Sequence, residues 1–304
     1  MKILNFLFLI TITLSCSESG KQTNLSETEQ WKLGWRMISS SWNNDHQLVE
    51  SQFDLLRTQN HKIDHKFLIT GLKTLHALGK RDKIDSILND LDAEQLQEIC
   101  KSDLFVLEMK DVKVCENIEP YVVKNADLQM ELIKMFVDDQ AVRGNVMEDL
   151  IEKYGLNKDE VTQGEDGFSS VDSKNRHRLK EIFLEYGFPT KEMVGKDAMH
   201  GVFLMIQHAD GETGWQKDQL SNIENAVKKG DMDGQSYAYL YDRIKINNGE
   251  NQLYGTQFSD VDPENGTVTL AETADIDNLD HRRMEIGMMP IEMYKELMLK
   301  NIQK

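Results

Sequence analysis

The chain has 304 residues, of which 39% are hydrophobic and 29% are charged. This balance is typical of a soluble globular protein and excludes a chain that is mainly disordered or membrane-spanning. The net charge of −17 argues against a nucleic-acid partner, because such binding needs a basic face that neutralises phosphates.

The first residues have the pattern of an export signal. Lys2 precedes an apolar stretch, 3–14, that is too short to span a bilayer. Residues 13–16 read Thr-Leu-Ser-Cys, which resembles the lipobox of bacterial lipoproteins, although Thr13 replaces the usual leucine. We therefore expect a signal peptide at 1–15, lipidation of Cys16 and a flexible tether at 16–28.

This interpretation predicts a cell-envelope protein, on the periplasmic or outer-membrane face, whose partner is the lipid bilayer through the Cys16 anchor. The alternative is an ordinary secretory signal with an incidental cysteine. Beyond Cys16 only Cys100 and Cys115 remain. They could pair in an oxidising compartment, but both lie among apolar helical positions, which favours unpaired thiols.

The predicted fold is mainly α. Residues 29–118 are expected to form helical hairpins of a solenoid-like kind, because aromatic residues such as Trp31 and Trp35 recur at helical spacing. Residues 119–304 are expected to form an α+β domain with one small β-hairpin. Its predicted helices cover about 127–153, 175–186, 197–209, 213–229 and 237–249, its strands cover 252–258 and 267–270, and two helices close the chain.

Several separated motifs in the second half resemble the bacterial family called domain of unknown function 6624. They are DDQAVR at 138–143, VDSKN at 171–175, YGFPT at 186–190, QHAD at 207–210, AYLYDRI at 238–244, QLYGTQ at 252–257 and DHRRMEIGM at 280–288. The resemblance covers a little over half of the chain. It implies a domain boundary and a site, but no reaction.

The helix that carries DDQAVR has an apolar stripe that becomes polar. Leu132 and Phe136 lie on one face, and the same face continues as Asp139, Gln140 and Arg143. Polar groups that emerge from a core must be satisfied inside or line a pocket. The alternative is a surface ion pair between Asp139 and Arg143.

His208 and Asp210 end the most apolar helix of the chain. Because they are two residues apart, their side chains should diverge. A histidine at a helix C-terminus is favoured electrostatically in any case. As a functional residue, His208 is the best candidate for a general base, with Asp210 or Asp139 as its catalytic partner.

The remaining candidates are ligand-binding residues. Arg243 could hold an anionic group or form a structural pair with Asp139 or Asp210, and one of the two arginines 282 and 283 is expected to face a pocket. The full predicted set comprises Gln140, Arg143, Asp242, Arg243, Tyr254, Thr256, Gln257 and Arg283. We expect His208, Asp139, Arg143, Arg243 and Gln257 to converge on one partly buried pocket.

No metal and no cofactor are predicted from these motifs. The Asp260-x-Asp262-x-Glu264 pattern is explained better by a hairpin turn than by a calcium loop. Three functions stay open: a module that binds a small polar or anionic ligand, a hydrolase-like or lyase-like enzyme that uses His208, and a structural or interaction protein of the envelope.

Overall fold

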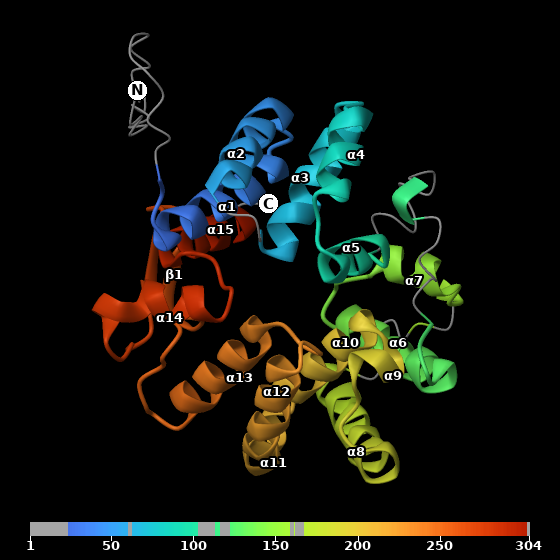
Figure 1. The fold of residues 1–304 in the computed structure, drawn as a ribbon. Helices are drawn as coiled ribbons and strands as arrows, with labels where there is room; N and C mark the ends of the chain where they lie inside the picture. The colour runs from blue at the N-terminus through green and yellow to red at the C-terminus, as the bar shows by residue number, and fades with distance from the viewer. Residues whose placement is uncertain are drawn as a thin grey trace, which may run out of the picture.

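The computed structural model describes residues 24–59, 63–102, 113–115, 122–158, 161 and 167–302. Within these ranges the protein is 69% helical, with 15 helices and a single two-stranded β-hairpin, which confirms the predicted mainly α fold (Figure 1). The signal peptide at 1–15, Cys16, most of the tether and the boundary near 119 lie outside the described residues.

The N-terminal helices form successive antiparallel pairs around their own core. They are α1 (Glu27–Trp42), α2 (His46–Gln59), α3 (His65–Ala77), α4 (Arg81–Asn89) and α5 (Ala93–Cys100). Glycines allow these helices to approach closely: a Cβ at Gly71 would lie 2.5 Å from the Phe53 ring. Phe53 is consequently fully buried at the centre of this first core.

A second core lies in the family-like half, around helix α10. The helices of this half are α6 (Ala126–Ala141), α7 (Glu148–Tyr154), α8 (Phe168–Tyr186), α9 (Lys191–Val194), α10 (Lys196–Gln207), α11 (Thr213–Asp218), α12 (Leu220–Lys228) and α13 (Gly234–Asn247). α10 packs against α6, α8 and α13. Its residues Val202, Met205 and Ile206 are buried, as their apolar run predicts.

Two predicted helices are each divided in the structure. The helix expected at 127–153 ends at Ala141, and Gly144 follows with a left-handed φ of 79°, which an α-helix does not accommodate. The helix expected at 213–229 is divided at Gln219. Gln216 in α11 is buried and donates to the carbonyls of Ile206 and Gln207, which ties α11 to the end of α10.

The first strand of the β-hairpin was predicted at 252–258, but it lies further along the chain and shares only residue 258 with the prediction. β1 (Phe258–Asp262) pairs antiparallel with β2 (Thr267–Leu270). Residues 252–257 form a loop rather than a strand, because the Gln252 side chain donates to the carbonyls of Gln257 and Ala271 and to the Thr273 hydroxyl. The Gln252 backbone forms an isolated bridge with Thr273 rather than part of a continuous strand.

The closing helices, α14 (Leu279–Glu285) and α15 (Ile291–Ile302), return to the N-terminal helices. Figure 1 shows α15 beside α1, and α14 contacts α1. The Trp31 indole donates to the carbonyl of Met288 at 2.9 Å, and Lys66 donates to the carbonyl of Gly287. Met284 and Met293 pack against the first core. The two halves are thus joined through the end of the chain.

Cys100 and Cys115 form a disulfide, with their Cα atoms 5.4 Å apart, so the expectation of unpaired thiols was wrong. The apolar helical surroundings of Cys100 do not exclude pairing, because it lies at the last position of α5 and the chain folds back to it. Within the ranges that the structure describes, no helix combines the length and the apolar character that crossing a bilayer requires.

The second core predicts that the family-like half folds by itself. All buried members of this core lie between Leu128 and Ile244. We expect a fragment of residues 119–304 to unfold in one cooperative transition, measured by calorimetry and circular dichroism, at a lower temperature than the full chain because α14 and α15 lose their packing on α1. An aggregated fragment, or one without a cooperative transition, would show that the N-terminal helices complete this core.

Candidate functional site

The centre of the site is the carboxylate of Asp139, in the last turn of α6. The apolar stripe continues to it as predicted: Leu132 and Phe136 are buried, and Asp139 is fully buried at 0% exposure. A buried charge is tolerated only when it is paired and hydrogen-bonded. The interpretation of Asp139 as part of a surface ion pair is therefore wrong, although Arg143 does lie 3.3 Å from its Oδ1 atom.

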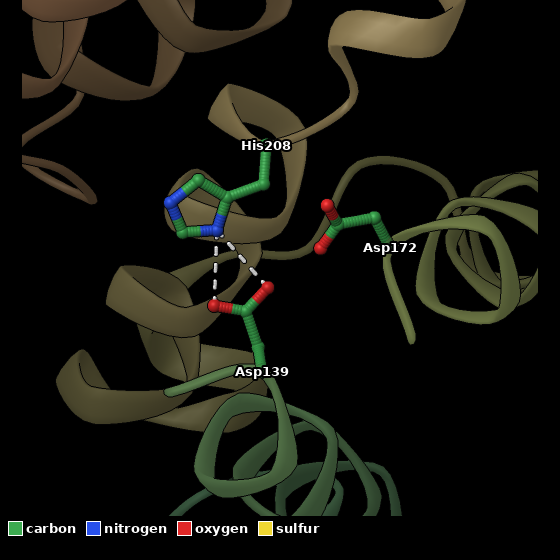
Figure 2. Close-up of side chains that lie close together, drawn as sticks. All are labelled: Asp139, Asp172 and His208. Atoms are coloured by element: carbon green, nitrogen blue, oxygen red, sulfur yellow. Dashed lines mark hydrogen bonds and ion pairs between the residues drawn. The ribbon is translucent and has the colours of Figure 1, made fainter. Parts of the chain in front are cut away.

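His208 is the main partner of Asp139. It caps the C-terminus of α10, and its Nδ1 atom lies 3.0 Å from each oxygen of the Asp139 carboxylate. Figure 2 shows that the second ring nitrogen points away from the carboxylates. The His208 side chain keeps 16% exposure, so the imidazole connects a buried carboxylate to the surface.

Two further residues contact Asp139: Gln140 in the last turn of α6, and Arg143 in the turn that follows α6. The Gln140 amide donates to Asp139 Oδ2 at 2.9 Å. The Arg143 guanidinium donates to the Asp139 backbone carbonyl at 2.7 Å and to the Asp172 carboxylate at 2.6 Å. Arg143 therefore links α6 to α8, and it is occupied by protein groups rather than open to an anionic ligand.

Asp172, in the first turns of α8, is the residue that sequence reasoning missed. One carboxylate oxygen of Asp172, one of Asp139 and one ring nitrogen of His208 all lie within 4.8 Å of one another. Figure 2 shows the three side chains together. The signal was available in the VDSKN motif. However, the helix was expected to begin only at residue 175, whereas α8 begins at Phe168 and places Asp172 on its inner face.

Arg243 and Asp210 form an ion pair beside this centre. The guanidinium donates through Nε and Nη2 to the two Asp210 oxygens. This hydrogen bond lowers the pKa of Asp210 and raises the pKa of Arg243. Of the two partners considered for Arg243, the structure selects Asp210, and Arg243 also interacts electrostatically with Asp172.

Asp242, Thr256 and Gln257 belong to a different network. Asp242 is fully buried and accepts hydrogen bonds from the backbone N–H groups of Leu253, Tyr254 and Thr256 and from the Thr256 hydroxyl. Burial raises the pKa of Asp242, and these donors oppose the shift by stabilising the carboxylate. Gln257 donates to the Thr256 hydroxyl.

The expected convergence is therefore only partial. The structure joins Asp139, Arg143 and His208 and places the Asp210–Arg243 pair beside them. In the described part of the chain, no hydrogen bond or ion pair connects Gln257 to this group. The Asp242 network holds the 253–256 loop in shape.

Arg283 and Tyr254 also have structural partners. Arg283 is fully buried, donates to the carbonyls of Met289 and Tyr254, and lies over the Tyr294 ring. Burial lowers its pKa. Arg283 thus has no surface to offer a ligand from solvent, and Tyr254 packs edge-on against Tyr237. Arg282 likewise donates to the backbone carbonyls of Leu253 and Ala274.

Two surface hollows of the described chain lie away from this site. One, of about 380 Å³, lies between α3 and α5 and is lined by residues that include His65, Leu68 and Glu98. Its lining includes an ion pair of His65 and Glu98 at 3.6 Å, but both side chains are exposed, unlike the buried Asp139 carboxylate. We therefore place the candidate site at the Asp139–His208 pair on the strength of its chemistry.

Fold and site together define a mainly helical protein with a buried carboxylate–imidazole pair between α6, α8 and α10. The chain belongs to a family of unknown function (DUF6624), whose model matches residues 126–302. This range includes every member of the site and also the closing helices α14 and α15. No curated protein and no solved structure matches the chain.

The Asp242 network predicts a large stability cost for a small chemical change. Asp242→Asn would replace an acceptor-only carboxylate by an amide whose NH₂ group faces backbone donors. We expect a loss of roughly 2 to 4 kcal/mol in the free energy of unfolding, measured by urea denaturation. Asp260→Asn on the exposed edge of β1 is the matched control and should change stability by less than about 0.5 kcal/mol. Equal stabilities for the two variants would contradict the assigned role.

Proposed function

We propose that this protein is an exported, membrane-anchored enzyme that uses His208 as a general base or acid, in hydrolase-like or lyase-like chemistry. The observation that carries the proposal is the pairing of His208 Nδ1 with both oxygens of the fully buried Asp139 carboxylate. The Arg143 and Arg243 pairs support an enzyme over a module that binds anions, because both guanidiniums are already neutralised by aspartates.

The chemistry follows from the donor and acceptor roles of the two side chains. A carboxylate only accepts hydrogen bonds, and a neutral imidazole carries one N–H. Nδ1 therefore holds the proton in the neutral ring, and Nε2 keeps its lone pair. Nε2, which points away from Asp139 (Figure 2), is then the atom that takes a proton from a water or a substrate hydroxyl.

Asp139 has two effects in this proposal. It fixes the orientation and the tautomer of the imidazole, as the buried aspartate does in serine hydrolases. It also stabilises the imidazolium that forms when Nε2 accepts a proton. Arg143 contacts Asp139 and is itself held by Asp172 of α8. Arg143 and Asp172 are positioning residues rather than catalytic ones.

Substitution of His208 separates this proposal from a structural role. We would assay the mature chain on chromogenic esters, amides, phosphoesters and glycosides. We expect turnover of one class to fall about 10²- to 10⁴-fold in His208→Gln, because glutamine cannot transfer the proton. The melting temperature should stay close to that of the native protein.

His177→Gln is the matched control, because the His177 side chain is 79% exposed on α8. It should leave turnover and melting unchanged. A His208→Gln variant that melts at a lower temperature and keeps full turnover would assign a structural role to the pair and contradict the proposal.

The anchoring part of the proposal rests on the apolar segment that ends at Ser15-Cys16. The Cys100–Cys115 disulfide supports export, because such bonds persist mainly in oxidising compartments. We expect mass spectrometry of the mature protein to find a diacylglyceryl-modified Cys16 at the N-terminus. Partitioning into detergent should be lost in Cys16→Ala. A mature N-terminus that begins elsewhere and carries no lipid would refute the anchor.

A further inference from the structure

Asp139, Asp172 and His208 also have the composition of a metal-binding site. One imidazole nitrogen and two carboxylate oxygens come from three helical segments and lie within 4.8 Å of one another. The sequence motifs did not predict this set, because its members are separated by 33 and 36 residues along the chain. Three protein ligands that leave a coordination position open are typical of reactive zinc sites.

The spacing of the donor atoms already approaches that of a coordination shell. Zinc binds nitrogen and oxygen at about 2.0–2.2 Å, so neighbouring ligand atoms are separated by about 3–3.5 Å. His208 Nδ1 lies 3.0 Å from both oxygens of Asp139. An oxygen of Asp172, whose side chain is 15% exposed, lies within 4.8 Å of the ligand atoms of the other two residues.

The Arg143 guanidinium is a cation that already contacts both carboxylates of the cluster. The Arg143 guanidinium lies 2.6 Å from Asp172 and 3.3 Å from Asp139, and its side chain is 24% exposed. It neutralises one of the two carboxylate charges. A dication would neutralise both, and the partly exposed Arg143 side chain can withdraw toward solvent without unfolding α6.

Asn175 supplies an independent sign that the inner face of α8 is incompletely satisfied. It lies one helical turn after Asp172 and is 7% exposed, and its Nδ2 atom has no hydrogen-bond partner. Buried amides are rarely left without a partner. Asn175 is buried in α8, which packs against α6, the helix of Asp139, and against α10, the helix that His208 caps.

We propose that Asp139, Asp172 and His208 bind one Zn²⁺ ion reversibly, and that the ion switches off the acid–base site. Zinc would take the Nδ1 lone pair, so the Nδ1 proton leaves to solvent and Nε2 takes up a proton instead. Nε2 then has no lone pair to offer a substrate. The inhibition rests on the proposed function, whereas the binding does not.

Calorimetric titration of the chelator-treated full mature chain with ZnCl₂, at one fixed pH, tests the binding. We expect one site per chain that saturates at a 1:1 ratio. Asp172→Asn, which keeps the size of the side chain and removes its charge, should weaken binding at least 10-fold. Glu212→Gln is the control, since this neighbouring carboxylate pairs with Arg176 and Lys180 outside the set, and it should bind as the native chain does.

An identical affinity in Asp172→Asn and the native chain, or the absence of a 1:1 site, would overturn the proposal. Should Asp172→Asn fail to fold, nitrogen NMR of the native chain replaces it: zinc should move the His208 proton from Nδ1 to Nε2, and an unchanged spectrum would overturn the site. Zinc bound at the site with turnover unaffected would overturn the inhibition alone. Turnover that survives His208→Gln would instead refute the proposed function and leave the zinc site standing.

Discussion

The burial of one carboxylate organises the second half of this protein. Asp139 lies at 0% exposure at the end of an otherwise apolar stripe, where an unpaired charge would cost several kcal/mol. Its partners are Gln140 on the same helix, Arg143 in the turn after that helix, and His208 at the end of α10. The packing of α6 on α10 and the chemistry of the site therefore depend on the same contact.

Asp172 connects a third helix, α8, to the same buried carboxylate. Arg143 holds Asp172 and the Asp139 backbone at the same time, so α8 is attached to the charged end of α6 as well as to its apolar face. A network of this kind is rigid when all its members are satisfied. Such rigidity is what an acid–base pair requires, because proton transfer depends on a fixed orientation of the imidazole.

The sequence predicted the two central residues of the site, Asp139 and His208, but not the third, Asp172. The 3.6-residue period placed Asp139 at the end of a core-facing stripe, and the apolar run 202–206 placed His208 at the end of a central helix. Both positions are confirmed. Asp172 was missed because α8 begins earlier than its sequence signals indicate: Gly167 precedes it, and no side chain caps its first turn. Pairing between residues 33 to 69 positions apart has no local signature.

Long-range pairing also explains why the predicted strand at 252–258 is mostly a loop. Alternating residues at 252–258 are typical of a strand, but the buried Asp242 carboxylate draws the N–H groups of residues 253, 254 and 256 away from strand pairing. A tertiary interaction thus overrides a local preference. The closing helices show a related effect, since their apolar residues pack against α1 and α3 at the other end of the chain.

The most direct measurement of the central claim is the tautomer of His208 in the metal-free protein. Nitrogen-15 NMR of histidine-labelled protein distinguishes a protonated Nδ1 from a protonated Nε2. The pairing with Asp139 predicts that neutral His208 carries its proton on Nδ1, with Nε2 unprotonated, and that Asp139→Asn removes this preference. A neutral His208 with its proton on Nε2, unchanged by that substitution, would contradict the account.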